Sequence, residues 1–108
     1  MKRPQTGQDV LQHEILGEQA STIGRLGEEL RKTLDALAAF DARTHASGAA
    51  PDRRDPKRMR LVDAAAYALW HFVVQRDCSG FRFTEKVLRD YAVPAEVRAK
   101  MGVALRPR

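Results

Sequence analysis

The chain has 108 residues, of which 44% are hydrophobic and 31% charged, and its formal net charge is +5. That is the composition of one soluble globular domain, which excludes a disordered or membrane-spanning class. A single cysteine, Cys78, excludes an internal disulfide framework and fits a reducing compartment. Because no apolar segment of a secretory signal follows Met1, we expect a cytoplasmic location.

The charge is divided unevenly along the chain. Residues 1–50 hold 6 Lys/Arg against 7 Asp/Glu, a balance of −1, whereas residues 51–108 hold 13 against 7, a balance of +6. The basic residues of 51–108 most often form a face that is exposed to water. A protein that binds a polyanion also needs such positive charge. The first interpretation is favoured, and the second stays open.

Residues 1–8 are polar and are expected to form a loose tail. Asp9 is a suitable N-cap for a helix that ends near residues 42–45. Between these points apolar residues recur every seventh position, with others at threes and fours, which predicts one long amphipathic helix: Leu16, Ile23, Leu30 and Leu37.

Three glycines lie inside this predicted helix, and each costs about 1 kcal/mol relative to alanine. Gly17, Gly24 and Gly27 form a strip of small side chains beside the apolar row. We expect the strip to permit close approach of a second helix. The alternative is a kink in the long helix.

Residues 46–55 combine Gly, Ser and Pro without an apolar anchor, so they predict a linker between two antiparallel helices. Asp55 followed by Pro56 predicts the start of a second helix, with Asp as N-cap and Pro at the first helical position. Ser79 and Gly80 predict its end after Cys78.

Two short helices are predicted after that, over residues 84–91 and 94–102, with residues 103–108 frayed. The whole chain is therefore predicted to be one all-α domain, a long two-helix antiparallel hairpin plus two short C-terminal helices. Two short helices also have the outline of a helix-turn-helix, but the second offers few hydrogen-bonding side chains to a base edge.

The first predicted helix is roughly 50 Å long and the second roughly 35 Å, so part of the first apolar stripe has no cover from its neighbour. Exposed leucines of this kind mark an association site. We therefore expect a homodimer with a four-helix core. The alternative is a compact monomer whose last helices fold over the stripe. The candidate interface residues are Leu16, Ile23, Leu26, Leu30 and Leu37.

Five basic residues crowd the start of the second predicted helix, where positive charge opposes the helix dipole. Such an arrangement is a candidate anion-binding site, for example for nucleic-acid phosphates. Three nearby aspartates reduce the net positive charge of this cluster, so a protein partner is favoured over nucleic acid. The candidate residues are Arg53, Arg54, Lys57, Arg58 and Arg60.

No residue pattern indicates catalysis. His71 and Cys78 are seven residues apart, about 10 Å along a helix, which is too far for a direct nucleophile–base contact. The three histidines have no metal-ligand spacing. We therefore expect no catalytic residue, no metal, no cofactor and no membrane partner.

Three segments carry a resemblance to a known family: residues 14–20 with Gly24, residues 69–78 with Gly80, and residues 87–97. Together they resemble a family of short, mainly proteobacterial, helical proteins catalogued as a domain of unknown function. The resemblance implies a small helical protein and no assigned activity. The function expected is a non-enzymatic protein-interaction or structural module that acts as a homodimer, with nucleic-acid or polyanion binding as the alternative.

Overall fold

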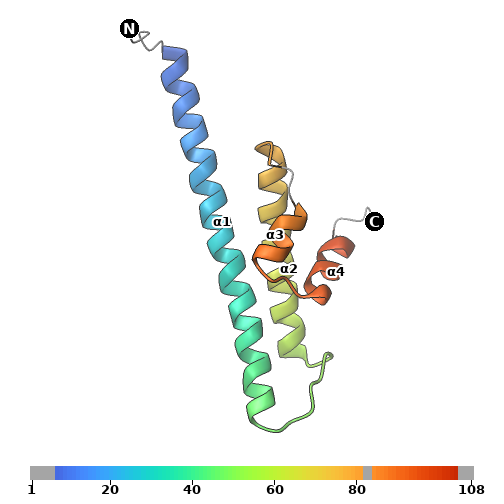
Figure 1. The fold of residues 1–108 in the computed structure, drawn as a ribbon. Helices are drawn as coiled ribbons and strands as arrows, with labels where there is room; N and C mark the ends of the chain where they lie inside the picture. Colours follow the sequence, from blue (N-terminus) through green and yellow to red (C-terminus); the bar gives the residue numbers. More distant parts are fainter. Residues whose placement is uncertain (1–6, 82–83, 105–108) are drawn as a thin grey trace.

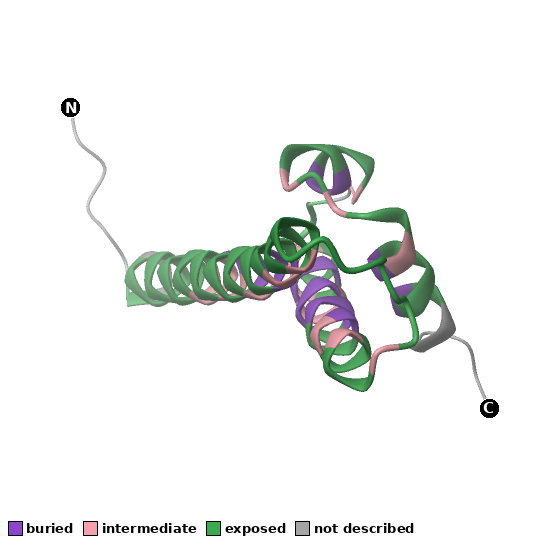
Figure 2. Ribbon diagram, turned by 90° about the horizontal axis from the view of Figure 1, so that it is seen from below, coloured by how far each residue is buried: buried purple, intermediate pink, exposed green. Residues whose placement is uncertain are grey.

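Four α-helices make up the residues that this computed structural model describes, 7–81 and 84–104 (Figure 1). They are α1 (Gly7–Ala46), α2 (Pro56–Cys78), α3 (Thr84–Asp90) and α4 (Ala95–Ala104), and no strand occurs in these two ranges. The helices α1 and α2 form a long antiparallel hairpin, and α3 and α4 lie on one side of it (Figures 1 and 2). The all-α hairpin fold predicted from the sequence is confirmed.

The ends of the long hairpin helices follow from local chemistry. The Asp55 carboxylate accepts hydrogen bonds from the backbone N–H groups of Lys57 at 2.8 Å and Arg58 at 3.4 Å, so α2 begins at Pro56 as predicted. The helix α1 begins at Gly7, two residues before the expected N-cap Asp9, whose side chain lies outside the described part. It continues without interruption through its interior glycines.

Left-handed residues terminate α2 and α3. Gly80 has φ +87°, and the backbone N–H of Phe81 donates to the carbonyl of Arg76 at 2.8 Å. The same geometry after α3 uses Ala92, with φ +50°, and here Val93 N–H donates to the carbonyl of Leu88 at 2.9 Å. Because Ala92 carries a Cβ, this turn stores backbone strain that glycine would not.

The core lies between the second half of α1 and the inner face of α2, and it extends to α3 and α4. Helix α4 packs against α2, with Val97 fully buried and Met101 8% exposed. Packing of these apolar faces against one another holds the four helices together. The buried apolar residues are Leu30, Leu34, Leu37, Val62, Ala65, Ala66, Ala68, Leu69, Phe72, Val73, Val87, Leu88, Val97 and Met101.

The close-packing prediction for the glycines holds at only one of the three. A Cβ at Gly27 would lie 2.7 Å from the Tyr91 hydroxyl and 3.3 Å from the Phe72 ring, so Gly27 provides the space that Tyr91 occupies. At Gly17 and Gly24 a Cβ would meet nothing within 4 Å. Within the described part of one chain no helix approaches these two closely: Gly17 lies where α1 projects beyond the hairpin, and Gly24 lies on the exposed side of a turn whose Ile23 and Leu26 pack against the core.

Candidate functional site

The N-terminal part of α1 projects beyond the hairpin (Figures 1 and 2). We call residues 10–18 the arm, and every one of them is exposed. Two of its apolar side chains are more than half exposed, Leu11 at 57% and Leu16 at 62%, and Val10 and Ile15 are exposed at 44% and 46%. An apolar surface of this kind, on a helix segment that nothing else in residues 7–81 and 84–104 covers, is a candidate protein-interaction surface.

The five residues predicted for a dimer interface do not lie on one surface. Leu30 and Leu37 are 0% and 2% exposed and belong to the core of the single chain. Ile23 and Leu26 are partly buried against the same core, whereas Leu16 lies on the arm. The heptad stripe therefore packs against α2 over its second half, and only its first half is free for a partner.

A groove of about 280 Å³ beside α4 and a groove of about 240 Å³ between α1 and α2 flank the hairpin. We call the second the back groove. Two of its lining residues, Tyr67 and His71, have their rings 4.5 Å apart, and the Trp70 ring lies 5.0 Å from His71 outside the lining. Tyr67 is 65% exposed although it is aromatic, which marks this wall as a second candidate contact surface. The back groove is lined by Leu26, Glu29, Thr33, Ala64, Tyr67, Ala68 and His71.

The predicted anion-binding cluster is divided by the fold, because Arg58 is committed to an internal ion-pair network. Its guanidinium donates to both carboxylate oxygens of Asp41 on α1, at 2.8 and 3.0 Å, and to Glu96 on α4. Its side chain is only 11% exposed. Arg58 therefore joins three helices, and Arg53, Arg54, Lys57 and Arg60 remain exposed around it.

The same network changes the proton affinity of its members. Hydrogen bonds from Arg58 lower the pKa of Asp41 and the pKa of Glu96, and burial opposes this only in part. The two carboxylates in turn raise the pKa of Arg58. The network is therefore fully charged at neutral pH, and four of the five guanidinium N–H donors of Arg58 are used by Asp41 and Glu96.

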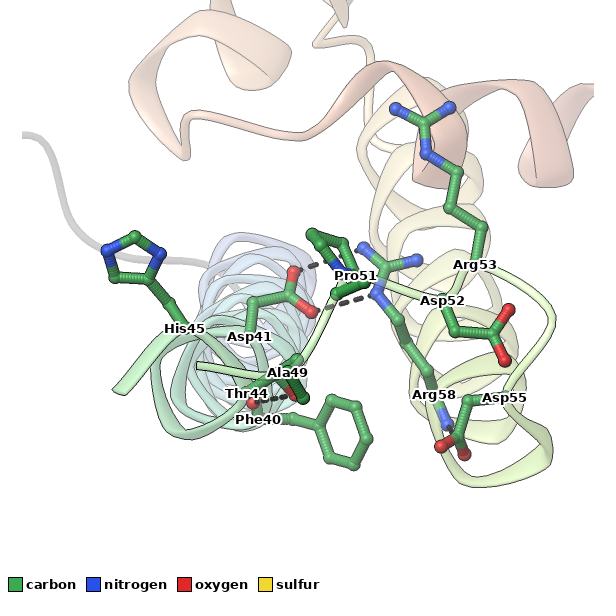
Figure 3. A pocket seen from close by; sticks show the side chains of 11 residues that line it. Phe40, Asp41, Thr44, His45, Ala49, Pro51, Asp52, Arg53, Asp55 and Arg58 are labelled. Atoms are coloured by element: carbon green, nitrogen blue, oxygen red, sulfur yellow. Dashed lines mark hydrogen bonds and ion pairs between the residues drawn. The ribbon is translucent and has the colours of Figure 1, made fainter. Parts of the chain in front are cut away.

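A cavity of about 390 Å³ lies between the hairpin helices and their connecting loop (Figure 3). Its carboxylates are already used within the chain. Asp55 caps α2, Asp52 accepts from the backbone N–H of Arg54 at 2.9 Å, and Asp41 binds Arg58. His45 points away from Arg58 (Figure 3). The cavity therefore offers no convergent set of free polar groups for a ligand.

The remaining chemistry-bearing residues lie apart. Cys78 is exposed at the end of α2, and the His71 ring lies against the Tyr67 ring. Within the described ranges no three His, Cys, Asp or Glu side chains gather in a way that could hold a metal ion. In the same part of the chain no helix combines the length and the apolar character needed to cross a membrane.

Sequence reasoning missed two features of this surface. The pairing of Arg58 with Asp41 and Glu96 joins residues 17 and 38 positions apart, so no local pattern could reveal it. The exposed row of α2 could have been found, because Ala64, Tyr67 and His71 follow helical spacing on the side away from Leu69.

The fold and these surfaces define a small all-α protein with exposed apolar side chains on its arm and beside its back groove. The chain belongs to DUF6665, a family of unknown function whose model matches residues 1–107. No curated protein and no solved structure matches it.

Proposed function

We propose that this protein is a non-enzymatic interaction protein that acts as a homodimer, with the arm as the contact between the copies. The observation that carries the proposal is the exposure of Leu11, Ile15 and Leu16 on a helix segment that no other described helix covers. Burying one such side chain contributes about 1.5–3 kcal/mol relative to leaving it in water. Contact with a second protein surface would bury these side chains and so supply that stabilisation.

Helix stability supports the same proposal. The arm continues a helix that is nucleated by its packed second half, so its stability depends on the helix propensity of its own residues and on any contacts they make. The arm has nine residues, and Gly17 within it lowers its helix propensity. A second chain packed along the arm supplies the contacts that would keep it helical.

The alternative function, polyanion binding, has weaker support. It retains four exposed basic residues, but Arg58 is neutralised by Asp41 and Glu96, and Asp52 and Asp55 lie among the others. A protein that bound nucleic acid through these side chains would lose affinity steeply with added salt. Absence of retention on DNA or RNA at low salt would remove this alternative.

Two variants test the proposal by sedimentation velocity. Leu16→Glu places a carboxylate on the row that continues toward Ile23, and we expect it to reduce the dimer to a monomer. Met59→Glu is the matched control, because Met59 is an apolar residue that is also exposed, at 43%, but lies on α2 outside the arm. A Leu16→Glu protein that sediments like the wild type would contradict the proposal.

A further inference from the structure

We propose that the arm of one copy docks in the back groove of a second copy of this chain, and that the two copies exchange arms reciprocally. The inference rests on the proposed function, since it names the surface that receives the arm in that dimer. Both halves of the contact occur on one chain, so a two-fold axis forms the contact twice.

The groove has the shape and surface that an amphipathic helix needs. Its α2 wall carries Ala64, Tyr67 and His71, and Val74 continues this row beyond the lining, at spacings of three and four that place all four along one side of the helix. Tyr67 is 65% exposed and Val74 36%. An apolar helix face laid into such a groove is a common mode of recognition, with the apolar residues of the helix as anchors.

Charge complementarity favours the arm as the occupant. The arm contains Glu14 and Glu18 and no Lys or Arg. The groove lining itself holds an acidic residue, Glu29, and no Lys or Arg, so the complementarity comes from the basic residues beside the lining. Opposite potentials of this kind orient two surfaces and speed their association. Four exposed basic residues flank the lining along α1 and α2: Arg25, Lys32, Lys57 and Arg60.

The position of the groove along α1 fits reciprocal exchange. The arm covers residues 10–18, and the α1 wall of the groove runs from Leu26 to Thr33. These two stretches lie at about equal distances on either side of Thr22, roughly 12 Å along the helix. A two-fold axis close to Thr22 therefore brings each arm level with the groove of the other copy.

A groove variant tests the inference by sedimentation equilibrium. Tyr67→Glu removes the exposed aromatic side chain and places a carboxylate against the acidic arm, so we expect the dissociation constant of the dimer to rise at least tenfold. Met59→Glu is the matched control. Met59 is 43% exposed on the same helix, but it lies beside α4 with Arg53 and Lys100 near it, so the dissociation constant should not change.

The outcomes separate this inference from the proposed function. A wild-type monomer would overturn both. A dimer that Leu16→Glu disrupts and Tyr67→Glu leaves intact would preserve the proposed function and overturn the arm-in-groove arrangement. A dimer weakened by Tyr67→Glu and unaffected by Met59→Glu supports the arrangement.

The single tryptophan provides a direct measurement of the arrangement. The Trp70 ring lies 6.2 Å from that of Tyr67, and Tyr67 lines the groove. Chains with Cys78→Ser are mixed with chains that carry Cys78→Ser, Trp70→Phe and a nitroxide quencher on His13→Cys. We expect the Trp70 fluorescence to be quenched only in the mixture. A quencher on Arg89→Cys, on α3, is the control, and equal quenching from both sites or none from His13→Cys would overturn the inference.

Discussion

At the scale of single residues, two glycines of α1 have opposite surroundings although they are three positions apart. Gly27 provides the space for the Tyr91 hydroxyl and the Phe72 ring, whereas Gly24 faces open space. Tyr91 in turn lies against the Phe72 ring edge at 5.5 Å and under the Arg31 guanidinium. Gly27 therefore fixes how the turn after α3 packs on the hairpin.

Alanine at these two positions should have opposite effects on the free energy of unfolding. Gly24→Ala should raise it by up to about 1 kcal/mol, because alanine favours the helix. Gly27→Ala gains the same propensity but displaces Tyr91, so we expect a net loss. Urea denaturation measures both, and equal stabilisation by the two variants would contradict the close approach at Gly27.

Two leucines of the same heptad row, Leu16 and Leu30, form a second matched pair. Leu30 is fully buried, so Leu30→Ala should lower the free energy of unfolding by about 2–5 kcal/mol. Leu16 is 62% exposed, so Leu16→Ala should change it by less than about 0.5 kcal/mol in a monomer. The comparison is made at protein concentrations low enough to exclude dimers, and a large effect at Leu16 there would place the arm inside the fold.

At the scale of elements, the sequence predicted the helices well where a local signal decides. Asp55 with Pro56 fixed the start of α2, and Gly80 fixed its end, because capping depends on neighbouring residues alone. The apolar stripe of α1 likewise predicted a buried face. The stripe alone could not show which of its residues pack against α2 and which stay exposed, because that depends on how the two helices align in space.

The role of Arg58 was also beyond sequence reasoning. Its partners come from α1 and α4, and only the folded chain brings them together. A charge run suggested anion binding, but one member of that run joins three elements. Arg58 therefore has a structural role that the other basic residues of the same run do not share.

The network of Arg58 gives α4 a pH-dependent attachment. Because the pKa of Glu96 is lowered in the folded chain, the unfolded chain binds its proton first as the pH falls, and acid favours unfolding. The contribution of Glu96 to stability is present above its ordinary pKa of 4.5 and is lost as the pH falls through the folded value.

Glu96→Gln tests this attachment. The variant should be less stable than the wild type at pH 7 by on the order of 1 kcal/mol, and the difference should close in acid, below the folded pKa of Glu96. Glu85→Gln is the control, because its ion pair with Arg98 is exposed, at 76% for the Glu85 side chain. Denaturation curves at several pH values give the comparison. A Glu96→Gln deficit that persisted unchanged in acid would mean that the network does not hold α4.

At the scale of the whole molecule, the chain combines an acidic apolar arm with a basic hairpin. The arm extends from a core that is complete without it, since the buried residues of α1 begin at Gly27. The first half of α1 therefore contributes little to the fold of one chain and offers its apolar side chains to another. This division of α1 into a packed half and a projecting half underlies the proposed dimer.

The mass of the wild-type protein in solution, measured by light scattering across a dilution series, tests the dimer most directly. The proposed assembly requires twice the 12.1 kDa of one chain at high concentration, with dissociation on dilution. A mass of 12.1 kDa at every concentration would show that the arm serves no second copy.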